Sequence, residues 1–503
     1  MSAPLAPVPI PPAPIPQPVL LGRVVAALRW SFLATVVVRF SSLGVSVLLA
    51  RLLGPPEFGV YAVALVALTA VLSLNELGVS VALVRYQGDE RLVAPTVATL
   101  SLAGSLVCYA VIFATAPRLA AAFGAPAAVG PIRVMGLAVL IDGLVAVPVA
   151  LLQRHFWQGR RAIADVTNFG VGAVVSIVLA LTGMGAMSLA IGRVAGSLVS
   201  AVQLVLLSPS RLRFGWARDQ VRHLLGVGVP LAGASLVVFA ILNLDNYVVG
   251  HSAGAVALGT YLLAFNLSSW PVTVLSQPVR KVTVPAFTQL LDDPPRLARA
   301  VIDSFGGLLS VTLPVAACLG ACAYPLVRVV YGHQWLSSAP ILIWLAGLGA
   351  CRVVLELLYD LLVALGDTQR LFLLQLTWLG LLAIGLPVGE QLGGVVGVAV
   401  THCLIAIVVI IPLHLVVIAA KLRLSLLSLL AVMLRPLGSV LIIVGVAVAI
   451  QRLVPEPLVP DQLGRDLLAL VGTGLAGGLL ALRALLALRT QVRALIAAEP
   501  GPA

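Results

Sequence analysis

The sequence predicts an all-α polytopic membrane protein with about fourteen transmembrane helices. Of its 503 residues, 60% are hydrophobic and only 10% are charged, whereas about a quarter of the residues of a soluble domain are charged. Apolar runs of about 20 residues recur between Val24 and Ala487, and each can cross a hydrocarbon core about 30 Å thick. Short polar or glycine-rich segments such as YQGDER and GDTQR separate these runs. The chain is therefore not an ordinary soluble domain.

The chain begins with a proline-rich segment. Residues 1–18 hold eight prolines and no charged residue, so they lack the cationic start of a cleaved signal peptide and are not expected to form a helix. We expect residues 1–22 to be a disordered cytoplasmic tail, the first span to act as an uncleaved signal, and residues 491–503 to be a second tail. The predicted spans cover, in order, residues 25–48, 58–82, 94–116, 130–152, 163–182, 186–207, 226–249, 258–282, 300–323, 338–364, 370–389, 394–418, 431–451 and 466–487.

Basic residues set the expected orientation. The formal net charge is +12, and most of the 31 Lys and Arg residues fall in the two tails and in the loops after even-numbered spans. Because cytoplasmic segments are enriched in basic residues, we expect a multi-pass protein of the cytoplasmic (inner) membrane with both termini in the cytoplasm. Basic segments such as RHFWQGRR lie between apolar runs and form no separate soluble surface, which argues against a nucleic-acid partner.

An internal repeat at an offset of 200 residues predicts the architecture. The segment LARLLGPPEFGVYAVAL aligns with VVGHSAGAVALGTYLLAF, and identical residues meet at four positions: Gly54 with Gly254, Gly59 with Gly259, Tyr61 with Tyr261, and Ala64 with Ala264. The offset equals six predicted spans, which return the chain to the same side of the membrane. We therefore expect two parallel six-helix lobes, residues 23–210 and 211–425, followed by a helical hairpin at residues 426–490.

Two charged residues inside predicted spans point to a polar path between these lobes. Arg39 lies in the first span and Asp245 in the seventh, which is its repeat equivalent. A carboxylate in hydrocarbon costs about 2.5 to 3.5 kcal/mol on insertion scales, and such groups usually face a hydrated cavity. We expect Arg39 to bind an anion in the cleft, and Asp245 with Asn243 and Asn246 to form a gate or a polar contact nearer the outside. The alternative, that each charge pairs inside its own lobe, stays open.

The remaining intramembrane charges are harder to assign. Arg352, Glu356 and Asp360 follow each other at intervals of four along the tenth span. Arg352 and Glu356 can neutralise each other on one helix face, which favours a structural role over a substrate contact. Arg193 in the sixth span and Asp142 in the fourth have no partner on their own helices, and whether they pair with each other is an open question.

The sequence favours a transporter over an enzyme. It holds no phosphate-binding loop with GKS or GKT, no histidine pair at metal-ligand spacing and no large polar domain for a nucleophile and a base, so we predict no cofactor and no metal site. The five cysteines fall inside apolar runs and are expected to be small buried hydrophobic residues. Because the loops are short, the membrane core is the functional part.

Two long segments carry a resemblance to a known family. ARLLGPPEFGVYAVALVALTAVLSLNELGVSVALVR, residues 50–85, resembles the hallmark of the polysaccharide biosynthesis exporters, the lipid-linked oligosaccharide flippases of the MATE-like superfamily. NLDNYVVGHSAGAVALGTYLLAFNLSSWPVTVLSQPVRKVTVPAFTQLLDD, residues 243–293, resembles its second-half counterpart. YGHQWLSSAPIL and ALGDTQR also look like the family, and the similarity covers roughly residues 20–420.

The resemblance implies that spans 1, 2, 7 and 8 line a cavity for the pyrophosphate and sugars of an undecaprenyl-linked glycan. It makes cavity residues of Arg39, Asn243, Asp245, Asn246 and Asn266, and the intramembrane cations Arg193 and Arg352 complete the candidate substrate-binding set. Arg280 and Lys281, at the end of the eighth span, are candidates for a cationic entry on the cytoplasmic side, although a positive-inside anchor explains them equally well. Spans 1 and 7 are mostly Val, Leu and Ala, so we expect fewer cavity cations than the family pattern suggests.

These observations favour a flippase that translocates an undecaprenyl-pyrophosphate-linked oligosaccharide by alternating access between two lobes. A cation-coupled multidrug or small-molecule exporter of the same superfamily is the first alternative, with membrane carboxylates as cation ligands. A non-transporting scaffold for glycan assembly is the second. The expected partners are the lipid-linked oligosaccharide and the bilayer, with a polysaccharide polymerase and glycosyltransferases as further candidates.

Overall fold

The computed structural model describes residues 17–75, 83, 89–155, 157–209, 212–271, 287–453 and 462–497. Within these ranges every regular element is a helix. The first half contains α1 (Gln17–Asn75), α3 (Glu90–Ala122), η1 (Pro126–Ala128), α4 (Val129–Arg154), α5 (Gln158–Leu181) and α6 (Ala186–Leu207). The second half contains α7 (Arg218–Pro271), α9 (Pro294–Ala321), α10 (Ala323–Leu326), η3 (Val327–Tyr331), η4 (His333–Trp335), α11 (Ser338–Ala364), α12 (Thr368–Leu404), η5 (Ile405–Ile410) and α13 (Ile411–Leu422). The chain closes with α14 (Leu426–Leu434), α15 (Leu437–Leu453) and α16 (Gln462–Ala497).

Glycine breaks interrupt three of these helices. Gly54 in α1 has φ 69° and ψ 173°, and Gly254 in α7 has φ 82° and ψ 179°, a backbone conformation that L side chains rarely adopt. The hydroxyl of Tyr261 donates to Asp245 at 2.8 Å although 16 residues separate the two. Along one continuous helix those residues would lie about 24 Å apart, so the chain doubles back at Gly254. The matching conformation at Gly54 supports the repeat offset of 200 residues.

Eleven helices are long and apolar enough to cross a membrane within the described ranges. Three of them contain the breaks at Gly54, at Gly254 and at Gly393 with Gly394, where the sequence predicts boundaries between successive spans. The total of fourteen crossings remains a prediction. Residues 17–22, which we expected in the disordered tail, are instead the start of α1, because proline is tolerated in the first turn of a helix.

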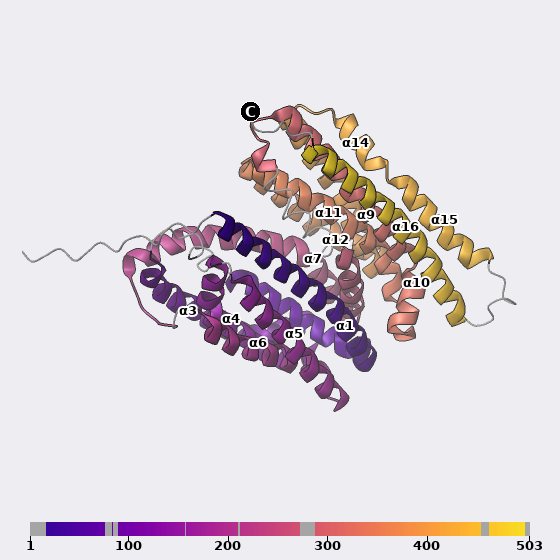
Figure 1. Cartoon of the computed structure of the whole chain (residues 1–503). Helices are drawn as coiled ribbons and strands as arrows, with labels where there is room; N and C mark the ends of the chain where they lie inside the picture. The colour runs from indigo at the N-terminus through magenta and orange to yellow at the C-terminus, as the bar shows by residue number, and fades with distance from the viewer. Residues whose placement is uncertain are drawn as a thin grey trace, which may run out of the picture.

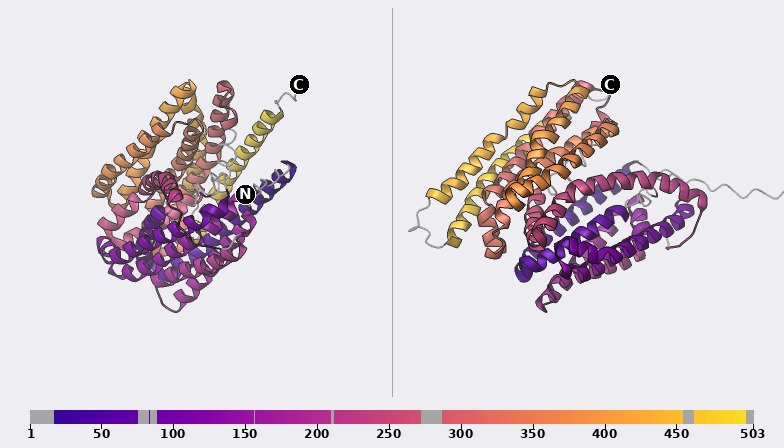
Figure 2. Two further views of the ribbon diagram at one scale, coloured as in Figure 1. Left: turned by 90° about the vertical axis from the view of Figure 1, so that its left-hand side faces the viewer. Right: turned by 180° about the vertical axis from the view of Figure 1, so that it is seen from behind.

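The helices form two lobes and a C-terminal pair. In Figure 1, α1 and α3 to α6 make one lobe, and α9, α11 and α12 belong to the other, with α15 and α16 packed on α9. The two lobes meet where α1 contacts α7, η3 and η4, and they diverge away from that region, as the view from behind in Figure 2 also shows. We call the region around Gly54 and Gly254 the turn end, and the end of the first lobe that carries residues 208–209 and 212–217 the linker end.

Large apolar side chains cover the outside of the lobes. Leu206, Leu392, Leu427 and Leu441 are each more than 70% exposed, which suits a surface that faces lipid. Inside a lobe, small residues let helices approach closely. A Cβ on Gly172 of α5 would lie 3.1 Å from the backbone oxygen of Gly192 on α6. Such close pairs replace the hydrophobic driving force, which lipid does not supply between helices.

Candidate functional site

The two repeated turns touch each other through their backbones at the turn end. A Cβ on Gly59 would collide with the carbonyl oxygen of Ala255, and a Cβ on Gly259 would lie only 2.8 Å from the amide nitrogen of Gly59. Glycine is therefore required at both positions for this contact. It joins α1 of the first lobe to α7 of the second.

Two equivalent side chains clamp the turns onto the opposite lobe. Nε of Arg51 donates to the carbonyl oxygen of Val330 at 2.7 Å, which ties α1 to η3 of the second lobe. Nδ1 of His251 lies 2.8 Å from the carbonyl oxygen of Ala122, which ties α7 to the end of α3. Because a carbonyl oxygen only accepts, Nδ1 of His251 carries the proton in this contact. Positions 51 and 251 differ by the repeat offset of 200, so the clamps form a symmetric pair.

Aromatic rings pack beside each clamp. Nε1 of Trp335 donates to the carbonyl oxygen of Ala50 at 3.1 Å, and its ring lies edge-on to Phe58 with centroids 5.4 Å apart. In the opposite direction, Phe123 lies edge-on to Tyr247 with centroids 5.8 Å apart. Backbone contact, clamps and rings together hold the lobes shut at the turn end.

The carboxylate of Asp245 is fully buried within the second lobe. Its side chain is 0% exposed, Oδ1 accepts from the amide of Asn246 at 2.8 Å, and Oδ2 accepts from the hydroxyl of Tyr261 at 2.8 Å. Nδ1 of His402 on α12 lies 3.4 Å from Oδ2. The expectation that Asp245 borders a hydrated cleft is therefore wrong for this conformation, because three groups of its own lobe surround the carboxylate. The open alternative, pairing within one lobe, is what the structure contains.

Asn243 and Asn246 extend this polar cluster along α7. Nδ2 of Asn243 donates to the carbonyl oxygen of Phe239 at 3.0 Å, and Nδ2 of Asn246 lies 3.3 Å from Oδ1 of Asn243. The buried oxygen Oδ1 of Asn246 has no hydrogen-bond partner among the described residues. An unsatisfied acceptor of this kind suits an arrangement that changes during a conformational cycle.

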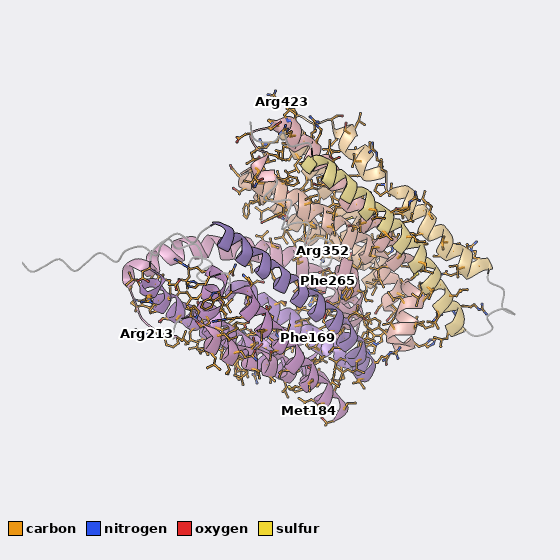
Figure 3. All side chains as sticks on the ribbon, in the orientation of Figure 1. Phe169, Met184, Arg213, Phe265, Arg352 and Arg423 are labelled. Atoms are coloured by element: carbon orange, nitrogen blue, oxygen red, sulfur yellow. The ribbon has the colours of Figure 1, made fainter. Side chains whose placement is uncertain are left out.

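Arg352 on α11 brings a positive charge to the same neighbourhood. Its Nη1 donates to the hydroxyl of Ser269 at 3.2 Å, and its guanidinium lies 5.2 Å from the ring centroid of Phe265. The guanidinium is also close enough to Glu356 and Asp245 for electrostatic attraction. Figure 3 places Arg352 and Phe265 near the centre of the molecule, where the lobes approach each other. Arg352 is only partly buried, whereas Asp245 is fully buried.

The other candidate residues do not join this cluster. Arg193 on α6 and Asn266 on α7 are exposed, and neither makes a hydrogen bond or an ion pair with any residue that the structure describes. Arg39 lies in the first half of α1. Arg280 and Lys281 lie outside the described residues. The structure thus brings Asn243, Asp245, Asn246 and Arg352 into one polar cluster, and sequence reasoning missed His402 and Tyr261 as its other members.

The sequence also contains GHSAG, residues 250–254, which has the spacing of the nucleophile turn of serine hydrolases. That turn requires a strand followed by a helix. Here Ser252 lies in α7 and its hydroxyl donates to the carbonyl oxygen of Val248 at 2.8 Å. Its position and its bond fit the end of a helix and not a nucleophile.

A cavity of about 600 Å³ lies between α9, α11, α13 and the C-terminal helices. Its walls are almost entirely apolar, with Leu313, Gly347, Ile411 and Val444 as representatives and Gln451 as a polar lining residue. Cys351 also lines it and is free, like the other four cysteines. Because it offers so few polar groups, this cavity does not suit a charged or sugar-bearing head group. No group of three metal-ligating side chains occurs within the described part of the chain.

Comparison with known sequences shows which proteins this chain resembles. A model of the family described as "Polysaccharide biosynthesis protein" matches residues 48–340. The chain is 28% identical to the succinoglycan biosynthesis transport protein ExoT of Rhizobium meliloti over 59% of this chain and 60% of that protein, so the match spans about three fifths of this relative. It is 24% identical to the lipopolysaccharide biosynthesis protein WzxC of Escherichia coli over 77% of this chain and 80% of that protein.

Two solved structures share the fold. The lipid II flippase MurJ, in an inward closed conformation, superimposes with a TM-score of 0.70 at 16% identity, over 93% of this chain and 100% of that one. A MATE family multidrug transporter in an inward-facing conformation gives a TM-score of 0.61 at 17% identity, over 77% of this chain and 98% of that one. The fold is therefore MATE-like, as the sequence predicts.

Proposed function

The chain belongs to the polysaccharide biosynthesis protein family, since that family matches residues 48–340 of its 503 residues, and we propose that it flips an undecaprenyl-pyrophosphate-linked oligosaccharide across the cytoplasmic membrane by alternating access. Relatives named for the transport or biosynthesis of surface polysaccharides support this substrate class. The likeness to a lipid II flippase supports the fold on which such a reaction can run.

The closed turn end is the observation that carries the mechanism. A head group with a pyrophosphate and sugars cannot cross hydrocarbon unaided, because each unsatisfied polar group costs several kcal/mol. Two lobes that are shut at one end and diverge toward the other have the arrangement of an alternating-access transporter, in which the central site opens to one side of the membrane at a time. With both termini in the cytoplasm, as the basic residues predict, the turn end faces outward and this conformation accepts substrate from the cytoplasm.

We assign the anion contact to Arg352. Arg352 is the charged member of the central polar cluster whose surface is partly exposed, whereas Asp245 is fully buried. A guanidinium also presents donors that match phosphate oxygens. Glu356 and Asp245 attract this charge electrostatically in the present conformation. Arg39, Arg193 and Asn266 are proposed as further contacts along the path, and Arg280 with Lys281 as the cytoplasmic entry.

A second candidate function rests on the buried Asp245 and His402 pair. A carboxylate and an imidazole 3.4 Å apart in the membrane core are residue types that form ion and proton pathways in membrane proteins. A cation-coupled exporter of small molecules would use such a pair as its coupling site. A proton-coupled flippase would use the same pair as its coupling site, so the identity of the substrate distinguishes the exporter from the flippase.

The deciding experiment follows the precursor in a deletion strain. Lipid-linked glycans are extracted after whole cells are treated with a membrane-impermeant reagent that labels sugars. Accumulated precursor that stays unlabelled, together with loss of surface polysaccharide, supports the flippase. Unchanged precursor, labelling and surface glycan in a strain without a second homologue, combined with new drug sensitivity, would establish the small-molecule exporter instead.

A further inference from the structure

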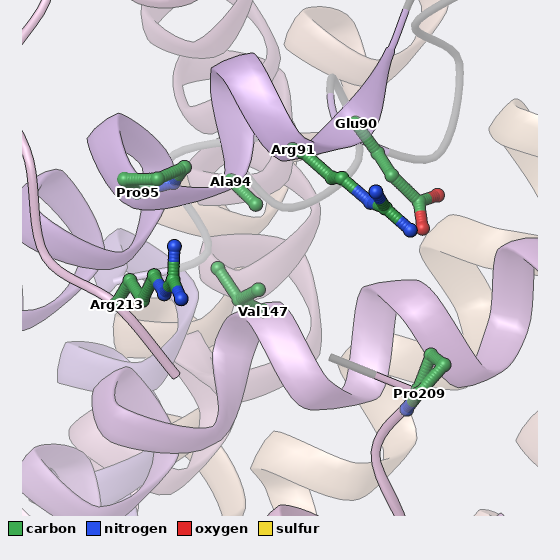
Figure 4. A pocket seen from close by; sticks show the side chains of 7 residues that line it. All are labelled: Glu90, Arg91, Ala94, Pro95, Val147, Pro209 and Arg213. Atoms are coloured by element: carbon green, nitrogen blue, oxygen red, sulfur yellow. The ribbon is translucent and has the colours of Figure 1, made fainter. Parts of the chain in front are cut away.

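A charged pocket of about 300 Å³ lies at the linker end of the first lobe, away from the central cluster. Figure 4 shows how three segments converge on it. The start of α3 contributes Glu90, Arg91, Ala94 and Pro95, α4 contributes Val147, and the segment between the lobes contributes Pro209 and Arg213.

The segment that carries Arg213 is fastened to α3. The hydroxyl of Thr99 donates to the carbonyl oxygen of Gly215 at 2.8 Å, and the amide of Gly215 donates to the carbonyl oxygen of Pro95 at 3.2 Å. The amide of Ala217 donates to the hydroxyl of Thr96 at 3.3 Å. A Cβ on Gly215 would lie 2.9 Å from the side chain of Pro95, so the segment rests directly on the helix. Arg213 therefore lines the pocket from a fastened segment, and in Figure 4 it lies across the pocket from Arg91.

The pocket carries positive charge that the described residues do not balance. The carboxylate of Glu90 is engaged elsewhere, since Nε of Arg154 lies 3.2 Å and Nε2 of His155 lies 3.0 Å from its oxygens. The guanidinium groups of Arg91 and Arg213 make no hydrogen bond or ion pair with any residue that the structure describes. Both side chains are exposed and line one pocket, so an anion bound in the pocket is attracted by both charges.

We propose that this pocket binds the phosphate group of a membrane lipid. Two guanidinium groups supply paired donors that match phosphate oxygens. Ala94, Pro95, Val147 and Pro209 give the pocket apolar walls, which suit the ester part of a lipid better than a free, fully hydrated phosphate.

The position of the pocket fits the membrane surface. The same segment exposes Phe214 by 53% and Trp216 by 63%, and aromatic side chains of this kind lie at the level of lipid head groups. The phosphate belongs either to an anionic phospholipid or to a polyprenyl carrier. In both cases a lipid holds the segment that joins the lobes against the first lobe.

The test compares binding of three probes to the purified full-length protein in phosphatidylcholine nanodiscs: phosphatidylglycerol, a polyprenyl phosphate and inorganic phosphate. Binding is followed by native mass spectrometry and by the thermal shift. The variants are Arg91→Gln with Arg213→Gln, and Arg91→Lys with Arg213→Lys. Arg423→Gln is the control, because it removes an exposed arginine that follows α13 in the second lobe (Figure 3) and lines neither cavity described here.

We expect at least one lipid to bind the wild type and the control equally, and to bind the double glutamine variant at least about tenfold more weakly, which corresponds to about 1.4 kcal/mol. The double lysine variant should keep part of the affinity because it keeps the charge. The stronger of the two lipids identifies the source of the phosphate. The proposal is overturned if the wild type and a folded double glutamine variant bind the lipids equally. It is also overturned if the double lysine variant binds them no better than it binds phosphatidylcholine alone. Inorganic phosphate that binds as well as either lipid overturns the assignment to a lipid.

Discussion

Arg51 and His251 occupy equivalent positions in the two repeats, and each donates to a backbone carbonyl of the opposite lobe, Arg51 to Val330 and His251 to Ala122. The two halves of the molecule therefore close the turn end by the same geometry with different chemistry. One clamp is permanently charged, whereas the other depends on an imidazole. The clamps, the glycine contact and the polar cluster behind them lead to the first four predictions below, and an ion pair at the edge of the second lobe leads to the fifth.

Removing the clamps should loosen the turn end. A charged hydrogen bond contributes about 1.5–3 kcal/mol and a neutral one about 0.5–1.5 kcal/mol, so Arg51→Ala should shift the closed population more than His251→Ala. Leu258 is fully buried at the turn end, so Leu258→Cys in a chain without the native cysteines serves as a reporter. We expect an impermeant maleimide to label this reporter faster in each variant and fastest in the double variant. Labelling at the wild-type rate in the double variant would contradict the clamp.

Adding a methyl group at the glycine contact should open the turn end more strongly. Gly59→Ala places a Cβ against the backbone of Ala255, which has no rotamer with which to move away. We expect the variant to insert normally but to lose surface glycan, and the Leu258→Cys reporter to be labelled without any clamp mutation. Gly44→Ala, in the same helix with no atom within 4 Å of the added Cβ, is the matched control and should behave as wild type. Wild-type export by the Gly59→Ala variant would disprove the tight contact.

The hydroxyl of Tyr261 should stabilise the second lobe through Asp245. Tyr261→Phe leaves a buried carboxylate without one of its donors, and we expect a loss of about 1–3 kcal/mol of stability, measured by thermal unfolding in detergent. The same change in an Asp245→Ala background should cost much less, because its partner is gone. Tyr359→Phe is the control, since the structure describes no hydrogen bond of the Tyr359 hydroxyl. Equal effects of Tyr261→Phe in both backgrounds would mean that the two side chains act independently.

Arg352→Gln should reduce export at least about tenfold while the protein still reaches the membrane, because the proposed anion contact loses its charge. Arg352→Lys should retain part of the activity, since an ammonium keeps the charge but not the paired donors. Arg299→Gln removes an exposed arginine of α9 and should leave export unchanged. Surface glycan and the amount of protein in the membrane are measured together. Full export by Arg352→Gln would move the anion site elsewhere.

Acid should weaken the connection between the start of α12, where Asp367 is the N-cap residue, and α13. The hydrogen bond from Lys421, 2.7 Å long, holds the pKa of Asp367 below its usual range. A depressed pKa means that the stabilisation is complete above the unfolded pKa of about 3.9 and is lost as the pH falls through the folded value. We expect Asp367→Asn to lower the melting temperature at neutral pH but not at a pH below the folded pKa. Asp292→Asn is the control for the loss of one exposed carboxylate. A melting temperature for Asp367→Asn that runs parallel to wild type at every pH would contradict this assignment.

The fold was largely predictable because membrane spans depend on local composition. Long apolar runs, glycine breaks and basic loops are visible in the sequence, and the repeat at an offset of 200 predicted two parallel lobes. Gly54 and Gly254 then adopt the same unusual backbone conformation. The total of fourteen spans stays a prediction, because three of the eleven long apolar helices in the described ranges each contain a glycine break.

The polar cluster was only partly predictable. Sequence reasoning selected Asp245 as an expensive charge, but it could not place His402, which lies 157 positions further along the chain and has no periodic relation to Asp245. The sequence identified Tyr261 only as the repeat equivalent of Tyr61 and not as a partner of Asp245. The repeat gives one clue: position 45 holds a valine where position 245 holds the aspartate, so the charge has no counterpart in the first lobe and lies beside His402 of another helix.

The contact between Gly59 and Gly259 also limits how this chain can change over time. At most packed pairs of residues, two substitutions can compensate for each other, because a larger residue on one side is offset by a smaller one on the other. Here both partners are already the smallest residue, and each meets backbone, which every residue type possesses. No second substitution can therefore rescue a first. We therefore expect natural variants of this chain to retain both glycines, while other positions of the two repeats can differ from each other.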